Sequence, residues 1–492
     1  MFNLPLRVIA KTKLSGAAAS VTFTLADYTI PAGTRHLAVI VNARGDRATT
    51  NENMNVTFNG DGGANYNAQE LNAEGAAAAA GRNTGATSLR AFTCAGASAT
   101  ANVFGGGMFI IPHYAGSANH KALLSIGGTA ESFLSMLAGR WANAAAITSI
   151  TVTTSSSGNY NANSIFLLCA VDERYLVEEQ LLAADGTVTF SSIPQLDGDL
   201  VALGFVRTDR AAVSDDIDVT VNADTTDANY ARQRLSGSNT TTAAAAAADR
   251  ALIEGVPGDS ATANAFGAFV LSISQHANGV KQPHILVVSG YHETSGPTSN
   301  VAVASGRRAN IAAYTSMLFA PGAGGTNLKS GSLISLYHVP KRLVDYDKLT
   351  VDATSVTHTV PAGLEALVES VFARSDEAAA TDTMETSFNN DVTDANYDAQ
   401  ILTGDGATVA AAQSAASRAS ATVPAASATA NIFGGGVKLI PAYAETDRHK
   451  HSLSIDGAAD DIVALRSKRW ESLTAITEID QTLAGGDNFE GD

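Results

Sequence analysis

An internal repeat that occurs three times constrains this chain more than any other feature of its sequence. The string SATAN-x-FG begins at Ser98, Ser260 and Ser427. The string NY-x-x-Q-x-L precedes each copy by 31 to 33 residues and begins at Asn65, Asn229 and Asn396. Because two independent strings stay in step through three copies, the chain is built from three homologous units of about 164 residues.

Further motifs extend the repeat along most of each unit. An apolar segment ending in R-x-D recurs at 37–46, 200–209 and 367–376, shortly after an Ile-Pro or Val-Pro pair. The first and third units share a late R-W pair and the string I-P-x-Y, at 111–114 and 440–443. The second unit has diverged at both places, where it reads RR (307–308) and ISQH (273–276). The units are therefore homologous but not interchangeable.

Each unit has the pattern of many short β-strands. Segments such as SVTFTL (20–25) and ITSITVTT (147–154) are rich in β-branched residues, and clusters of Gly, Asn, Ser or Pro separate them. Short strands at this spacing are typical of a β-sandwich or barrel. The alanine tracts at 76–80 and 243–248 leave one helical turn and a loop both open. The sequence therefore predicts an all-β fold of three tandem, jelly-roll-like β-sandwich domains in a pseudo-threefold arrangement.

The N-terminus is expected to complete the third unit. An ungapped alignment places Phe2–Val8 over Ile165–Val171, the last strand of the first unit. No such strand follows in the third unit, and an unpaired sheet edge favours pairing with a free strand. The N-terminal strand can close its own chain or be donated to a neighbouring chain, and closure of its own chain is preferred because the effective concentration is higher. We therefore expect domains at residues 11–171 and 172–339, and a third at residues 340–492 plus 1–10, closed by the N-terminal strand.

Charge and composition disfavour several classes of partner. The 31 basic and 48 acidic residues give a net charge of −17, which argues against binding to nucleic acid or to an anionic membrane surface. No apolar run approaches the length of a transmembrane helix, and the N-terminus lacks the apolar core of a signal peptide. Charged residues make up only 16% of the chain, which suits a neutral surface that packs closely against other proteins. Cys94 and Cys169 lie in apolar segments and are expected to be buried free thiols.

No catalytic, cofactor or metal site is expected, and hence no enzyme activity. The sequence holds no G-x-S-x-G, H-E-x-x-H, C-x-x-C or phosphate-binding loop motif. His449 and His451 share one face of a predicted strand, but the first unit keeps only His120 there and the second keeps neither. An acidic cluster is formed by Asp215, Asp216 and Asp218. It lacks the spacing of a calcium-binding loop, so it is expected to form a solvated turn.

Other recurring residues are assigned structural roles. The triplet RGD begins at Arg44, but the other units keep only R-x-D, which favours an Arg–Asp pair that closes a loop over an adhesion motif. The tyrosine of each Asn-Tyr pair is expected to be half-buried. Core positions are expected for Phe104, Phe266 and Phe433. Three lysines recur just before a predicted strand: Lys121, Lys281 and Lys450. Two interpretations of them are open, namely charges that protect an edge strand and residues that contact a partner.

The combination of A-N-Y-x-x-Q-x-L, an Ala/Ser-rich stretch, A-N-x-F-G and I-P-x-Y resembles a unit of structural proteins in tailed-bacteriophage virions. The resemblance covers most of the first and third units and less of the second. It implies a non-enzymatic virion protein without cofactors, assembled in the bacterial cytoplasm. The expected role is a capsid-surface decoration or cement protein that binds other virion proteins, with the major capsid protein at threefold-like positions as the expected partner.

Two other readings are open at this stage. The first is a tail-fibre or baseplate component that binds a host receptor or glycan, although only two Trp and 6% aromatic residues are available for glycan contacts. The second is a glycan depolymerase, which needs a close pair of carboxylates. No such pair recurs across the units, so the structural reading is preferred. Self-association of the chain is left open.

Overall fold

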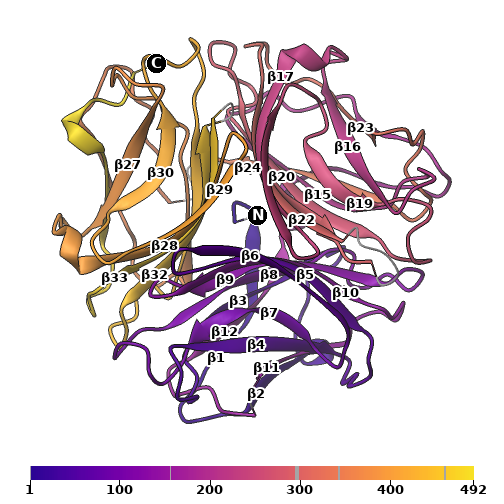
Figure 1. Cartoon of the computed structure of the whole chain (residues 1–492), viewed down its shortest axis with the longest axis horizontal. Coiled ribbons are helices and arrows are strands. Elements are labelled where there is room, and N and C mark those ends of the chain that lie inside the picture. The colour runs from indigo at the N-terminus through magenta and orange to yellow at the C-terminus, as the bar shows by residue number, and fades with distance from the viewer. Residues whose placement is uncertain (1, 156, 294–298, 342–343, 459–460, 492) are drawn as a thin grey trace.

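The computed structural model is all-β, as predicted, and describes residues 2–155, 157–293, 299–341, 344–458 and 461–491. Figure 1 shows the strands gathered in three groups around a centre, in chain order from indigo to yellow. Within the described residues the helices are single 3-10 turns, and none is long and apolar enough to cross a membrane. These turns are η1 (Leu25–Asp27), η2 (Glu173–Tyr175), η3 (Asp227–Asn229), η4 (Asp394–Asn396) and η5 (Ala484–Gly486).

The first unit is a sandwich of a large and a small antiparallel sheet. The large sheet has the strand order β1 (Leu6–Lys13), β12 (Ile165–Val171), β3 (Leu37–Ala43), β8 (Gly105–Ile111), β9 (Lys121–Thr129), β10 (Phe133–Trp141), β5 (Tyr66–Glu74) and β6 (Ala77–Ala86). The small sheet has the order β2 (Ser20–Thr24), β11 (Ser149–Thr154), β4 (Asn51–Phe58) and β7 (Leu89–Ala95).

The second unit repeats this arrangement strand for strand. Its large sheet has the order β13 (Leu176–Leu181), β24 (Leu333–Pro340), β15 (Gly198–Val206), β20 (Gly267–Ser274), β21 (His284–Tyr291), β22 (Asn300–Arg308), β17 (Tyr230–Ser238) and β18 (Thr241–Ala247). Its small sheet has the order β14 (Val188–Phe190), β23 (Met317–Pro321), β16 (Ser214–Val221) and β19 (Ile253–Pro257).

The third unit repeats the small sheet but only part of the large one. The small sheet has the order β25 (Ser355–Thr359), β34 (Glu478–Leu483), β27 (Thr381–Phe388) and β30 (Ala419–Pro424). The large sheet has six strands, in the order β26 (Ala366–Ser370), β31 (Gly435–Pro441), β32 (Lys450–Ala458), β33 (Ile462–Trp470), β28 (Tyr397–Asp405) and β29 (Thr408–Ser414). Among the described residues, counterparts of β1 and β12 are missing from this sheet, so β26 is an edge strand.

The hydrophobic pattern of the strands explains the layers. Strand β4 of a small sheet alternates buried and half-buried residues, because one of its faces is wet. Every residue of β9 in the large sheet is buried, because that sheet is covered on both faces. One face packs on the small sheet of its own unit, in a separate core cluster. The other face packs against the large sheets of the other two units.

The inner faces of the three large sheets share a single hydrophobic cluster, which we call the central core. It contains the leucine of each Q-x-L motif, fully buried in all three units: Leu71, Leu235 and Leu402. Full burial of one such side chain contributes about 1.5–3 kcal/mol. The repeat therefore preserves residues that join the units to one another as well as residues that build each sandwich.

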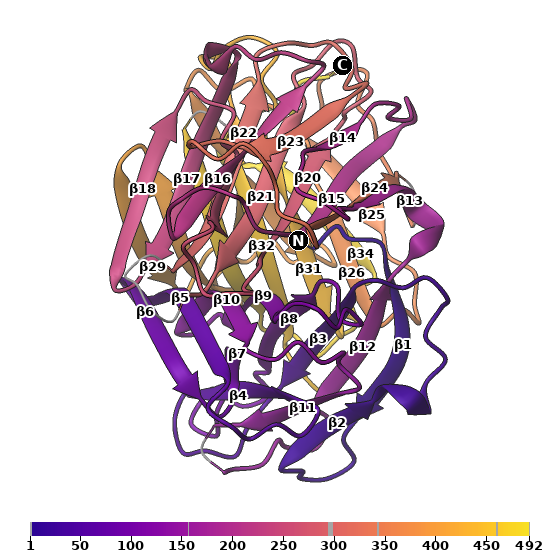
Figure 2. The same ribbon diagram turned by 90° about the vertical axis from the view of Figure 1, so that its right-hand side faces the viewer.

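The N-terminal segment does not complete the third unit, so that prediction is wrong. Strand β1 pairs with β12 of the first unit, from Leu6 opposite Val171 to Lys13 opposite Ile165. Strand β13 pairs with β24 in the same way, which makes β1 the counterpart of β13 rather than of β12. Phe2 lies in the central core, and Figures 1 and 2 show the N-terminus in the interior of the ring. Met1 and Asp492, which the predicted third domain included, lie outside the described residues.

The alanine tracts are strands, not helical turns or loops. They form β6 and β18, each the outer strand of a hairpin, and β29 is their counterpart in the third unit. These three strands contact one another around the centre, where small side chains let the hairpins approach closely. A Cβ atom added at Gly404 of β28 would lie 2.9 Å from Cβ of Leu235 and 3.2 Å from Cβ of Ala244. Contacts between units therefore override the local helix propensity of alanine.

Candidate functional site

The arginine of each R-x-D motif holds the SATAN loop of its own unit. The Arg44 guanidinium donates hydrogen bonds of 2.8–3.0 Å to four backbone carbonyl oxygens, those of Ala97, Ala99, Thr100 and Val103. Arg207 and Arg374 each bind four carbonyls of the corresponding loop. One planar, charged side chain thus fixes a loop that has no strand partner of its own.

The aspartate of R-x-D binds a different loop, so the predicted Arg–Asp pair is wrong. The Asp46 carboxylate accepts hydrogen bonds from the backbone N–H and the side chain of Asn159, at 2.8 and 2.9 Å. These bonds hold the pKa of Asp46 below its ordinary value. Asp376 binds Asn488 in the same way. The RGD triplet of the first unit is therefore a junction between two loops.

The tyrosine of each Asn-Tyr pair is fully buried, not half-buried as predicted. The Tyr66 hydroxyl accepts a hydrogen bond from the N–H of Phe58 (2.9 Å) and donates to the carbonyl of Asp61 (3.0 Å). Burial raises the pKa of Tyr66 to about 12. The Asp61 carboxylate in turn accepts a hydrogen bond of 2.7 Å from Trp141 Nε1.

The second unit keeps this junction with a different donor. Arg308 stands where the other units have tryptophan, and its Nε lies 2.9 Å from the Asp224 carboxylate, the counterpart of Asp61. The apparent loss of the R-W motif in the second unit is therefore a replacement of one N–H donor by another.

The glutamine of each NY-x-x-Q-x-L motif binds the neighbouring unit. Gln69 exchanges two hydrogen bonds of 2.9 Å with the backbone of Asn239, in the β17–β18 turn of the second unit. Gln233 donates to the carbonyl of Gly406 in the third unit, and Gln400 donates to that of Gly75 in the first. Each glutamine thus holds the hairpin turn of the next unit, and the third contact returns to the first unit.

The asparagine of each SATAN string takes part in a second cyclic set of contacts. The backbone N–H of His120 donates to the carbonyl of Asn264 in the next unit, over 3.0 Å. Gln282 binds Asn431 and His449 binds Asn102 in the same way. All three asparagines have φ values near +60°, a conformation that asparagine tolerates better than most residues. The two repeated strings therefore mark one interface, formed three times.

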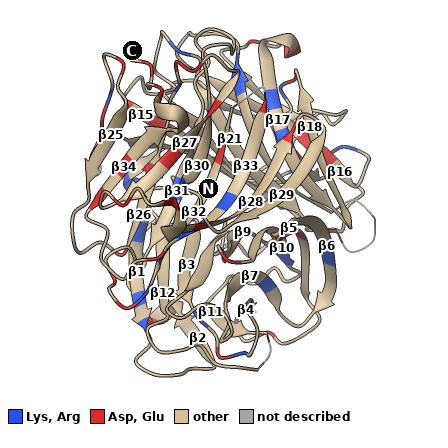
Figure 3. Ribbon diagram, turned by 60° about the vertical axis from the view of Figure 1, so that its left-hand side comes forward, with Lys and Arg blue, Asp and Glu red and all other residues tan. Residues whose placement is uncertain are grey.

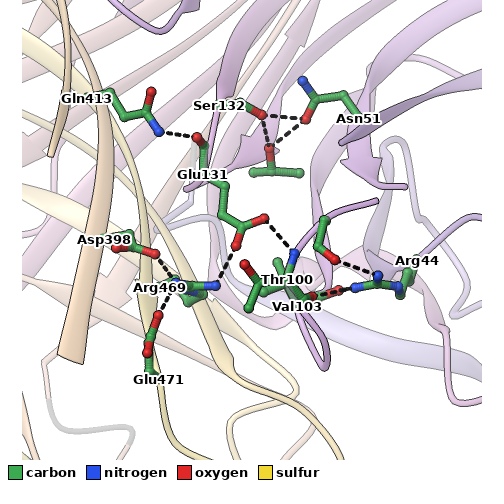
Figure 4. A network of polar contacts seen from close by, with 12 residues as sticks. Arg44, Asn51, Thr100, Val103, Glu131, Ser132, Asp398, Gln413, Arg469 and Glu471 are labelled. Carbon is green, nitrogen blue, oxygen red and sulfur yellow. Dashed lines mark hydrogen bonds and ion pairs between the residues drawn. The ribbon is translucent and has the colours of Figure 1, made fainter. Parts of the chain in front are cut away.

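An ion-pair network strengthens this interface between the third and first units (Figure 4). The Arg469 guanidinium lies 2.6 Å from the Glu131 carboxylate of the first unit and also contacts Asp398 and Glu471. Glu131 in turn accepts a hydrogen bond from the N–H of Thr100, in the loop that Arg44 holds. The network links the SATAN loop of one unit to the sheet of its neighbour.

The recurrent phenylalanines are buried, as predicted, and they lie beside the interfaces between units. Phe104 is 7% exposed, and Phe266 and Phe433 are each 5% exposed. A cation from the neighbouring unit covers two of these rings, namely Arg448 over Phe104 at 4.3 Å and Lys281 over Phe433 at 4.0 Å. These contacts stabilise both the loop and the interface.

The three recurrent lysines are not equivalent and do not lie beside edge strands. Lys121 and Lys450 begin interior strands, and each donates to two backbone carbonyls. Burial lowers the pKa of each to about 8. Lys281 precedes β21 and corresponds in position to Arg448, as its contact with Phe433 shows.

The remaining candidates also have structural roles. His451 is buried and its Nε2 lies 2.9 Å from the hydroxyl of Ser467, whereas His449 contributes its backbone to the interface. The predicted solvated turn at 215–218 is wrong, because these residues belong to β16, where burial raises the pKa of Asp216 to about 6. Cys94 and Cys169 are buried free thiols, as predicted.

One cluster of three acidic residues within the described part of the chain has the spacing of a metal site. One carboxylate oxygen from each of Glu377, Asp382 and Asp487 lies within 4.8 Å of the others. Asp382 already accepts a hydrogen bond of 2.7 Å from the hydroxyl of Ser375. Acidic clusters of this kind are common without a metal, and the expectation of no metal site stays a prediction.

Comparisons with known proteins give no family. No family model matches the sequence, and no curated protein matches it. A structural comparison finds the mouse laminin alpha1 chain, domains LG4-5, at 8% sequence identity. That comparison covers 67% of this chain and 94% of that chain, with a TM-score of 0.13, too low to support an argument about fold or function.

Proposed function

We propose that this chain is a non-enzymatic structural protein of a tailed-phage virion, most simply a capsid-surface decoration or cement protein that stabilises the head. The observation that carries the proposal is the cyclic interface, in which the repeated glutamines and asparagines join three similar units around one core. Such a body offers three similar faces to a partner of like symmetry.

The composition of the surface supports a packing role. Figure 3 shows acidic and basic residues scattered among a majority of other residues. Because charged residues make up only 16% of the chain, few charges need to be desolvated when it packs against another protein. The proposed partner is the major capsid protein at threefold-like positions of the lattice, and the proposed localisation is the virion.

The test is to add the purified chain to capsids that lack it. We expect saturable binding at threefold-like positions, seen by electron microscopy, and greater resistance of the capsids to heat or chelator. The control variant is Gln233→Ala, which removes a contact between the second and third units inside the chain. It shows how much a less rigid chain alone changes the binding to capsids. Binding to host cells or glycans without any change in capsid stability would instead support the alternative, a tail-fibre or baseplate component.

A further inference from the structure

The arginine of the R-W pair is buried in both the first and the third unit, but only one of the two has acidic partners. Arg140 is 2% exposed and Arg469 is 5% exposed. The guanidinium of Arg469 contacts three carboxylates (Figure 4), those of Glu131, Asp398 and Glu471. Within the described part of the chain, Nε and Nη1 of Arg140 are buried and have no hydrogen-bond partner. The two interfaces therefore treat the same charge differently.

One cause of this difference lies in the strand beside the arginine. Asp398 lies opposite Arg469 in the ladder of β28 and β33, whereas Asn67 lies opposite Arg140 in the ladder of β5 and β10. The amide of Asn67 has no charge, and its oxygen already accepts a hydrogen bond of 3.0 Å from the N–H of Gly85. Asn67 therefore does not neutralise the arginine as Asp398 does.

A second cause is the residue after the tryptophan. The third unit has Glu471 there and the first unit has Ala142, on equivalent backbone. The N–H of Glu471 donates to the carbonyl of Asn396, and the N–H of Ala142 donates to that of Asn65, both over 2.8 Å. The side chain of Glu471 is 37% exposed, so its carboxylate approaches the arginine from the side of the solvent. The partly exposed Ala142 leaves this approach open in the first unit.

The third acidic partner binds elsewhere in the first interface. Glu293 corresponds to Glu131, since each accepts a hydrogen bond from the threonine N–H of a SATAN loop. Both carboxylate oxygens of Glu293 are held by Thr262, one by its N–H and the other by its hydroxyl. Whereas Nη1 of Arg469 lies 2.6 Å from Glu131, Nη1 of Arg140 has no such contact.

The groups around Arg140 add positive charge to the interface. Arg82 stands where the third unit has Gln413, and its Nε lies 3.3 Å from Nε2 of His292. Burial, and then the charge of Arg140, lower the pKa of His292 to about 3 and that of His120 to about 4. Both imidazoles are therefore neutral at pH 7, and the arginines keep their protons at any ordinary pH.

We infer that Arg140 binds a small monovalent anion, which takes the place that the carboxylates of Asp398 and Glu471 have beside Arg469. A buried charge is stable only when an opposite charge or several hydrogen bonds accompany it. The site lies between the first and second units, because Arg140 belongs to the first and His292 to the second. This inference rests on the comparison of the units and is independent of the proposed function.

The test compares the purified chain with Asn67→Asp, which supplies the carboxylate that the third unit has at this position. Thermal unfolding is followed in low-salt buffer with increasing sodium chloride, and in separate series with sodium nitrate and sodium acetate. We expect a higher unfolding midpoint for the variant at low salt. The difference should shrink by about 2 °C as an anion binds the parent. General effects of salt act on both proteins alike, and the anion that acts at the lowest concentration is the preferred one.

Chloride NMR measures the binding directly. The parent should broaden the chloride signal in a saturable way, and Asn67→Asp should lose this broadening. Ala142→Glu is a second variant, which supplies the carboxylate of Glu471 from the side of the solvent and should have the same effect. The control is Arg7→Gln, which changes the net charge equally at an exposed position and should broaden the signal like the parent. Equal broadening by the parent and both acidic variants would overturn the inference. So would a midpoint difference that stays constant in all three salt series.

Discussion

The second and third units, with eight and six described strands in their large sheets, differ in how their sandwich cores are built. The second unit has one continuous sandwich core under an eight-stranded sheet. The third has two smaller clusters under a six-stranded sheet, yet it keeps the loop held by Arg374, the buried Tyr397 junction and both sets of cyclic contacts. The difference teaches that these contacts form in the same way under a described sheet of six strands as under one of eight.

The largest effect is expected from truncation of the repeated phenylalanines. Phe266→Ala should lower the free energy of unfolding by about 3–5 kcal/mol, because the ring is buried in the central core and stacks on Phe205 at 4.8 Å. Phe433→Ala should cost less, about 3 kcal/mol, because Phe433 already lines a pocket of about 140 Å³ between the second and third units. Denaturant unfolding of both variants measures the difference, and equal losses would mean that the pocket does not weaken the third unit.

The loop contacts test whether the third unit depends on the same junctions as the first. Arg44→Ala and Arg374→Ala should each cost about 3 kcal/mol, because each removes a charged donor that binds four backbone carbonyl oxygens. Arg→Lys at the same positions is the control, since lysine keeps the charge but cannot reach four carbonyls. Calorimetry of the four variants would contradict the interpretation if the lysine variants were as stable as the parent.

The stability of the protein should fall in acid because of one buried histidine in each of the second and third units. The first unit has no histidine at the same position. Burial lowers the pKa of His284 and of His451 to about 4, and the first unit has Ala122 there. Between pH 6.5 and about 4 the unfolded chain binds more protons than the folded chain, so stability falls as the pH falls, by about 2 kcal/mol per histidine at pH 5.

His451→Gln is the variant for this pH dependence. It should flatten the curve of unfolding free energy between pH 7 and pH 5 while the contribution of His284 remains. Unfolding curves at several pH values measure the slope. An unchanged slope would show that the imidazole of His451 is not the titrating group.

The smallest effect is expected at the open edge. Val368→Lys should change the free energy of unfolding by less than about 0.5 kcal/mol, because the side chain is exposed. Val201→Lys at the same position of the second unit should be strongly destabilising, because it places a charge in the central core. Thermal unfolding of this pair compares the two units at one position, and similar losses would mean that the edge of β26 is covered in solution.

The sequence predicted the repeated architecture because two strings recur in step. It could not show that Gln69 and Asn102 bind other units, since their partners, Asn239 and His449, lie far away in the chain. The N-terminal strand was misplaced because the alignment matched Phe2–Val8 to β12 itself. The strand instead forms four residues later, at Leu6–Lys13, and pairs with β12. Apolar pattern alone does not distinguish these two overlapping segments. The alanine strands were missed because they are set by contacts between hairpins.

The direction of the glutamine contacts has a consequence for how such a chain evolves. Each glutamine binds the turn of the next unit and never its own, so a gene encoding one unit would need three copies of its product to close the ring. In that homotrimer every substitution would appear three times at once. Fusion into one gene removes that constraint, and the exchange of tryptophan for Arg308 in the second unit alone is a change that only a fused chain can acquire.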